Sequence, residues 1–134
     1  MKIKILTLGT LALSLSLAAI AAETVKLPPA ADKQGVNYAT DIKPIFEENC
    51  FKCHGAEKQK AKLRLDSLEA ALKGGEDGKV IKPGDSTKSD LVLSVAHVGD
   101  PDTFMPKGGK GKKAEPLTAE QVGLIRAWID QGAK

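Results

Sequence analysis

The fold is decided by one short stretch of sequence, Cys50-Phe51-Lys52-Cys53-His54, which is followed by Gly55. Residues three and four positions apart lie on one face of a helical turn, so the two thiols and the imidazole project together. This C-x-x-C-H pattern is typical of covalent haem attachment, in which the thiols join the vinyl groups and the histidine binds the iron. The sequence therefore predicts one haem c held by Cys50, Cys53 and His54.

Three other kinds of site also use paired cysteines, and each needs a feature that the sequence does not offer. A thioredoxin-like redox pair follows a strand within a βαβ unit, whereas the residues before Cys50 have a helical pattern. A structural zinc site needs four ligands, and only His54 and His97 are available to join the cysteines. A disulfide across two intervening residues would be strained. We therefore favour haem attachment over these three alternatives.

Residues 1–22 have the pattern of a cleaved signal peptide. Lys2 and Lys4 form a basic start, residues 5–20 are apolar, and Ala19-Ile20-Ala21 fits a small-residue cleavage site. The alternative is an uncleaved membrane anchor, for which the apolar run is barely long enough. Export agrees with the attachment of haem c, which takes place outside the bacterial inner membrane, so we expect a periplasmic or secreted protein.

Charge and composition limit the expected partners. The 134-residue chain has 20 basic and 17 acidic side chains, and cleavage would remove two lysines and leave a charge of +1. So balanced a chain is not expected to bind nucleic acid, and no membrane association is expected after cleavage. With three Phe, one Tyr and one Trp, the core lacks large apolar groups that haem would supply. We therefore expect an apoprotein of marginal stability.

The remainder of the chain divides into a lead-in and one domain. Residues 23–36 contain two adjacent prolines and small or polar residues, which predicts a flexible lead-in. Residues 37–134 contain no internal repeat or linker. They predict a single all-α domain with short extended pieces.

The first and last helices of this domain have the clearest signals. The first is expected to begin at Thr40 or Asp41, either of which can cap it, and to deliver the chain to Cys50. The last begins with a capping box formed by Thr118 and Gln121, and an apolar stripe follows. We expect this stripe to pack on the first helix.

Two shorter helices are predicted between them. Asp66 and Glu69 resemble a capping box before a helix over residues 68–72, which a pair of glycines would end. A further helix is expected to begin after Ser86 or Ser89.

Met105 is the predicted sixth ligand of the iron. It is the only methionine left once Met1 is removed, and it lies in residues 99–116, where Gly, Pro, Asp and Lys predict no regular structure. A methionine that fills a core would be expected on an apolar helical face, and Pro106 favours an extended backbone at Met105. Ligation by methionine and histidine is typical of cytochromes c and raises the reduction potential.

His97 is the alternative ligand. It lies near the end of the third predicted helix, where a lone histidine is more often a surface or helix-terminal group. A further alternative is that Met105 packs beneath its loop without touching the iron. We expect loss of Met105 to abolish the red iron–sulfur absorption band, and loss of His97 to leave it unchanged.

The chain resembles planctomycete-type cytochrome c domains in an ordered set of motifs. The set comprises Asp41-Ile42-x-Pro44-Ile45-Phe46, the haem motif with Gly55, Leu63-x-Leu65, Pro83-Gly84-Asp85, Met105-Pro106, Leu117-Thr118 and Trp128-Ile129-x-x-Gly132-Ala133. The resemblance implies a cytochrome c-like helical domain wrapped around one covalent haem. It also implies Cys50 and Cys53 on the vinyl groups, with His54 and Met105 on the iron.

These features predict a monohaem electron carrier, not an enzyme. It would pass single electrons between redox partner proteins by outer-sphere transfer through the haem edge, and we expect a monomer. One alternative is a haem peroxidase or gas-binding sensor with a labile sixth ligand. Another is a dedicated electron-accepting subunit of a dehydrogenase.

Two groups of lysines predict that the redox partner is acidic. They are Lys107, Lys110, Lys112 and Lys113 after Met105, and Lys58, Lys60 and Lys62 after His54. Because the two ligands would lie on opposite faces of one haem, both groups are expected near its rim. The alternative is that these lysines are only solvated loop residues, diluted by Glu57, Asp100 and Asp102.

Overall fold

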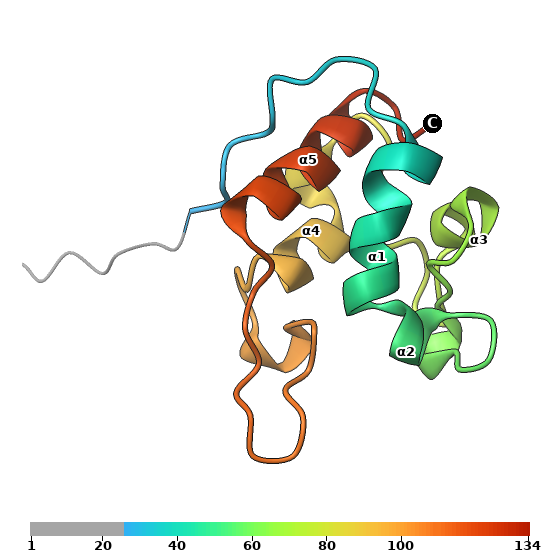
Figure 1. Ribbon diagram of the computed structural model, residues 1–134, viewed down its shortest axis with the longest axis vertical. Helices are drawn as coiled ribbons and strands as arrows, with labels where there is room; N and C mark the ends of the chain where they lie inside the picture. The colour runs from blue at the N-terminus through green and yellow to red at the C-terminus, as the bar shows by residue number, and fades with distance from the viewer. Residues whose placement is uncertain (1–25) are drawn as a thin grey trace, which may run out of the picture.

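The computed structural model describes residues 26–134, which form a mostly helical domain without a sheet (Figure 1). The helices of this part are α1 (Lys43–Asn49), α2 (Phe51–His54), α3 (Leu68–Lys73), α4 (Asp90–Val95) and α5 (Ala119–Asp130), with a π-helical turn η1 (Tyr38–Ile42) and 3-10 turns η2 (Lys60–Lys62), η3 (Ser86–Lys88) and η4 (Pro101–Thr103). Extended pairing within it is limited to two isolated bridges. The all-α prediction is therefore confirmed.

Two expectations fall outside the described residues. The predicted signal peptide, residues 1–22, lies there, as do residues 23–25 of the predicted lead-in. Among residues 26–134, no helix is both long and apolar enough to cross a membrane.

The chain enters its first helical segment earlier than the sequence predicts. Asn37 is the N-cap of η1, and its side chain accepts a hydrogen bond from a backbone N–H of that turn at 2.8 Å. Asp41 reaches back and accepts the Asn37 N–H at 2.8 Å. The prediction of Thr40 or Asp41 as the cap was therefore wrong. The earlier start gives Tyr38 a place in the core, where it is 6% exposed.

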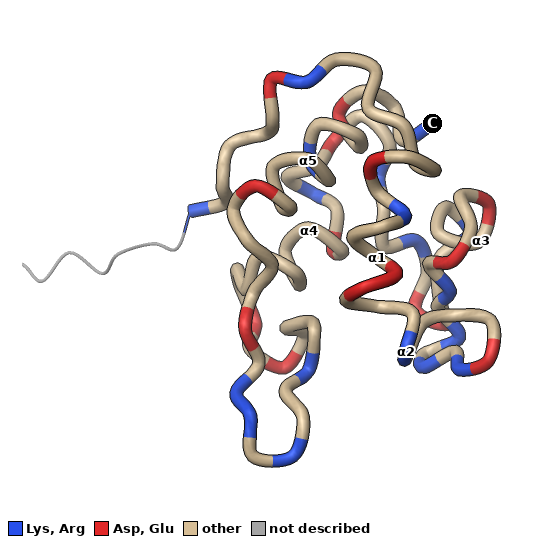
Figure 2. Tube along the Cα trace, in the orientation of Figure 1, with Lys and Arg blue, Asp and Glu red and all other residues tan. Residues whose placement is uncertain are grey.

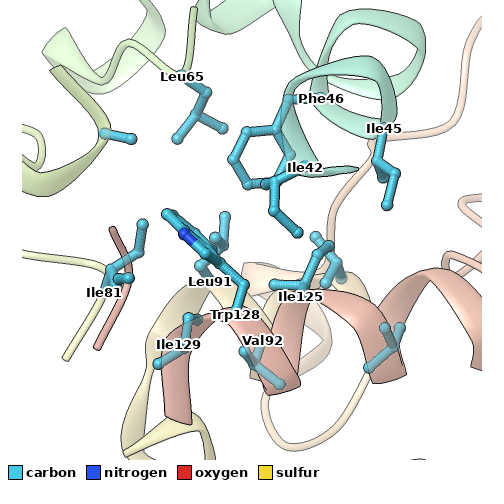
Figure 3. Close-up of a cluster of buried hydrophobic side chains, with 14 of the residues drawn as sticks. Ile42, Ile45, Phe46, Leu65, Ile81, Leu91, Val92, Ile125, Trp128 and Ile129 are labelled. Atoms are coloured by element: carbon cyan, nitrogen blue, oxygen red, sulfur yellow. The ribbon is translucent and has the colours of Figure 1, made fainter. Parts of the chain in front are cut away.

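The core lies where α1, α4 and α5 meet (Figure 1). Trp128 of α5 is fully buried, and its ring centroid lies 6.3 Å from that of Phe46 in α1 and 5.8 Å from that of Tyr38. Figure 3 shows Phe46 and Ile42 pointing toward Trp128 and Ile125 of α5. The predicted packing of the last helix on the first is confirmed.

Helix α5 begins as predicted. Thr118 Oγ1 accepts the N–H of Gln121 at 3.2 Å, and Gln121 Oε1 accepts the N–H of Thr118 at 3.1 Å, which completes the capping box. The predicted apolar stripe is buried along the helix. Gly132 follows the helix with a φ of +102°, a conformation that glycine adopts without steric cost.

Helix α3 has a different cap from the predicted one. Ser67 is the N-cap, and its Oγ accepts the N–H of Ala70 at 3.2 Å. Asp66 instead pairs with Arg64, with 2.6 Å between Nη2 and Oδ2. This hydrogen bond lowers the pKa of the Asp66 carboxyl and raises the pKa of the Arg64 guanidinium. The predicted Asp66 cap was therefore wrong by one residue.

Helix α4 follows η3, and Ser89 lies at its N-cap position. The hydroxyl of Ser89 does not cap the helix. It accepts the N–H of Lys82 at 2.9 Å and donates to the carbonyl of Asp85 at 2.9 Å. Ser89 is thus a buried cross-link beneath the turn that precedes α4.

The lead-in has no helix or strand from Leu27 to Val36, yet it is fastened to α5. The N–H of Ala31 donates to the Gly123 carbonyl at 2.9 Å, and the Gln131 amide donates to the Lys33 carbonyl at 2.8 Å. A Cβ at Gly123 would lie only 2.8 Å from the Pro29 carbonyl oxygen, so the close approach requires glycine.

Candidate haem site

Cys50, Cys53 and His54 share a single turn at the end of α1. Cys50 lies at the bend between α1 and α2, and its N–H still donates to the Phe46 carbonyl at 2.7 Å. Its carbonyl accepts the N–H of Cys53 at 3.0 Å and that of His54 at 2.8 Å. Backbone hydrogen bonds therefore fix the three predicted attachment residues relative to one another.

The two thiols are free but differ in exposure. Cys50 is 9% exposed and Cys53 is partly exposed, and no disulfide joins them. Burial raises the pKa of the Cys50 thiol to about 12, so it stays protonated at neutral pH. Neither sulfur is engaged in a disulfide, so both are free for thioether formation.

The structure does not provide the surroundings that the alternative cysteine sites need. Across residues 26–134, no three His, Cys, Asp or Glu side chains gather as a metal site. The same part of the chain contains no sheet from which a thioredoxin-like βαβ unit could be built.

The ring of His54 is oriented by a backbone carbonyl. Its Nδ1 lies 3.3 Å from the Leu63 oxygen, which can only accept, so Nδ1 carries the proton of this hydrogen bond. The other nitrogen, Nε2, then has the free lone pair that iron needs. A hydrogen bond of this kind fixes the ring and increases its basicity as a ligand. Sequence reasoning missed Leu63, because a backbone carbonyl leaves no mark in the side-chain pattern.

The segment that supplies this carbonyl is itself tied to the core. The N–H of Leu65 donates to the His54 carbonyl at 2.8 Å, and the Tyr38 hydroxyl donates to the Leu65 carbonyl at 2.6 Å. Burial, with smaller effects of the Asp66 and Cys50 charges, raises the pKa of Tyr38 to about 12. The segment over residues 63–65 is thus held between the attachment turn and the core.

Met105 lies in the long connection from α4 to α5. Apart from η4, residues 99–116 have no helix or strand, as predicted. Met105 is partly buried and packs against the core. Its N–H donates to the Ser94 carbonyl at 3.0 Å, and its carbonyl lies 3.1 Å from His97 Nε2. Figure 1 shows this connection and α2 at the same end of the molecule.

His97 contacts the backbone of Met105, and its ring also stacks on Phe104. The ring centroids lie 4.5 Å apart and the planes differ by 12°. The Met105 carbonyl can only accept, so His97 Nε2 carries the proton of their hydrogen bond. The structure thus engages His97 Nε2 with a residue of the loop, a contact that the sequence did not reveal.

These residues fit a covalently attached haem. Two free thiols and an imidazole with an available Nε2 share one turn, and a partly buried methionine lies in the connection between α4 and α5. This donor set is the one that haem c requires.

Comparison with known proteins supports this fit. Residues 50–109 match the family model described as Planctomycete cytochrome C. The match begins at Cys50 and includes Met105. No curated protein and no solved structure matches the chain. Residues 50–109 are therefore similar to the planctomycete cytochrome c domain, a domain that implies haem-based electron transfer.

Proposed function

We propose that the protein is an exported monohaem c-type cytochrome that carries single electrons between redox partners. The observation that carries this proposal is the attachment turn, Cys50 to His54. It presents two free thiols and an imidazole whose Nδ1 is already engaged. Residues 1–22 support export by their basic start, apolar run and cleavage pattern.

Each of four residues has one role in this proposal. Cys50 and Cys53 would hold the haem through thioethers, and His54 and Met105 would bind the iron. When bound, haem c supplies the one-electron iron couple.

The surrounding chain keeps these groups in place. The Leu63 carbonyl orients the His54 ring, and residues at the end of α4 form hydrogen bonds with the backbone of Met105. The buried side chains of α1 and α5 keep water out of the adjoining core. These supporting contacts hold the proposed ligands in place before haem binds. A fixed ligand set is what an electron carrier needs.

We also propose that an acidic redox partner docks on two lysine groups. The first, termed the lysine loop, consists of Lys107, Lys110, Lys112 and Lys113; the second, termed the lysine turn, consists of Lys58, Lys60 and Lys62. All seven are exposed, and none forms an ion pair within the described part of the chain. Figure 2 shows blue segments in both places at the end of the molecule where α2 lies. Clustered positive charge raises encounter rates with acidic surfaces.

The test is expression with a cytochrome c maturation system, followed by mass spectrometry of the denatured protein. The expected mass is the polypeptide without residues 1–22 plus one haem. The ferric protein is expected to be low-spin with the weak red iron–sulfur band. Extraction of the haem by acidic organic solvent would refute covalent attachment. A high-spin ferric spectrum would instead favour a peroxidase or gas sensor.

A further inference from the structure

The last turn of α4 ends on a histidine in a position where glycine is usual. The N–H of Val98 donates to the Leu93 carbonyl at 2.9 Å, and the N–H of His97 donates to the Ser94 carbonyl at 3.3 Å. This pair of bonds defines a Schellman ending, in which the residue after the cap adopts a left-handed conformation. His97 is that residue, with a φ of +54°. Glycine is favoured there because it has no Cβ to clash with the backbone.

The side chain of His97 makes contacts that glycine could not make. Its Nε2–H donates to the Met105 carbonyl at 3.1 Å, and its ring is stacked on Phe104. The ring is partly buried between these two groups. An unfavourable backbone conformation that persists beside a candidate site is grounds for asking what the side chain does there.

The end of α4 holds Met105 from both sides. The Met105 N–H donates to the Ser94 carbonyl at 3.0 Å, while its carbonyl accepts from His97. The connection is tied to α4 again only at Leu117, whose N–H donates to the Val95 carbonyl at 2.9 Å. Glycine and lysine dominate between Pro106 and Ala114. On this side of Met105, the two hydrogen bonds to the end of α4 are therefore the backbone contacts that hold it.

We infer that His97 is a positioning residue for Met105, acting through the hydrogen bond from its Nε2 to the Met105 carbonyl. This inference rests on the proposed function, in which the Met105 thioether is the sixth ligand. It departs from the expectation that loss of His97 leaves the iron–sulfur band unchanged. His97 does not replace Met105 as a ligand here; it restricts the backbone from which the thioether projects.

The experiment compares three variants of the haem-loaded protein. His97→Gly removes both side-chain contacts and should keep the end of α4, because glycine favours the left-handed conformation. His97→Gln restores a side-chain N–H that can reach a carbonyl. Ala61→Gly is the matched control, since Ala61 is also left-handed, with a φ of +53°, and is exposed in η2.

The readouts are the red band of the ferric protein and the affinity of imidazole, which competes with Met105 for the iron. In His97→Gly the band should weaken. Imidazole should bind roughly five- to tenfold more tightly, the effect expected for one lost hydrogen bond. His97→Gln should recover much of the wild-type affinity, and Ala61→Gly should match the wild type. Far-ultraviolet circular dichroism should be the same for all four proteins.

Each contrary outcome has one meaning. A wild-type protein without the red band would overturn the ligation by Met105 and hence the proposed function. A wild-type band together with unchanged imidazole affinity in His97→Gly would overturn only the role of His97. Equal weakening in the glycine and glutamine variants would refute the hydrogen bond as its cause. An equal effect of Ala61→Gly would show a general loosening of the backbone instead.

Discussion

The two regions that supply the proposed iron ligands are built in different ways. His54 lies on a turn that continues from α1, and bonds between near neighbours set its place, such as Cys50 N–H to the Phe46 carbonyl at 2.7 Å. Met105 lies in a connection whose only regular element is η4. Its place is set by Ser94 and His97, which belong to another segment.

This difference predicts that the two ligands differ in how easily local unfolding releases them from the iron. A helical turn attached to a buried helix opens only when much of the domain opens. A loop with few anchoring bonds belongs to the low-stability end of the same structure. The Met105 side should therefore release its ligand under conditions in which the His54 side, which the two proposed thioethers would also hold, keeps its own.

The largest expected effect comes from breaking the attachment turn. Replacing Cys50 and Cys53 together with Ala should abolish covalent haem, because no other cysteine exists in the chain. Mass spectrometry of the denatured protein should show the polypeptide alone. Either single replacement should leave one thioether and weaker retention. Haem that stays on the denatured double variant would show that these cysteines are not the attachment points.

Removing the proposed ligand in the Met105 region should leave the haem covalently attached and change the ligation of the iron. Met105→Ala should abolish the red iron–sulfur band and lower the reduction potential, because thioether ligation raises it. The covalent haem should remain in the denatured protein. Potentiometric titration and the ferric spectrum measure these effects. A red band that persists in Met105→Ala would mean that Met105 does not bind the iron. The loop would then not be a ligand-bearing region to compare with the attachment turn.

The same contrast explains what could be predicted from the sequence. Helix α5 was predicted correctly because its capping box, Thr118 with Gln121, lies within four residues. The placing of both cysteines and His54 on one turn was predicted for the same reason, since their spacing is local.

The features that sequence reasoning missed leave no mark in the pattern of side chains. The Leu63 carbonyl that orients His54 and the Met105 carbonyl bound by His97 are backbone groups, which every residue possesses. The cap at Asn37 depends on the burial of Tyr38, which is a property of the assembled core. Ligation by His54 and Met105 remains a prediction that spectroscopy can test.

A smaller effect is expected from Tyr38, which links the core to the segment that supports His54. The ordinary pKa of tyrosine is 10, and that of Tyr38 is raised to about 12. Because the folded value is the higher one, its contribution to stability is complete below pH 10 and is lost as the pH rises to about 12. Two units correspond to about 2–3 kcal/mol. Alkaline unfolding should therefore be steep in this range.

Tyr38→Phe tests this link between the core and the segment that holds His54. Removing the hydroxyl leaves the Leu65 carbonyl without its 2.6 Å partner, which should cost about 1 kcal/mol at pH 7. The alkaline loss of stability should become shallower. Urea unfolding at pH 7, 9 and 11 measures both. The red band should persist at pH 7, since Met105 belongs to the other region. An unchanged slope above pH 10 would show that Tyr38 does not govern alkaline unfolding.

The smallest expected effect concerns the surface that the two regions share. If an acidic partner docks across both, reversing Lys110, Lys112 and Lys113 to Glu should slow electron transfer severalfold at low salt. Reversing Lys58, Lys60 and Lys62 should do the same. Each change should also flatten the dependence on ionic strength, because such charges act over about 8 Å at physiological salt.

Stopped-flow mixing with an acidic electron acceptor across a range of ionic strength provides the measurement. The matched control reverses Lys79, Lys82 and Lys134, three exposed lysines that form no ion pair in the described part of the chain and belong to neither lysine group. It changes the net charge by the same amount, so a general charge effect would slow it equally. The ferric spectra should be identical throughout, which separates docking from ligation. Slowing by the lysine loop alone would place the partner on the Met105 side. Rates indifferent to salt and to every reversal would leave both groups as a contribution to solubility, because clustered charge that steers a partner must lose its effect when it is screened.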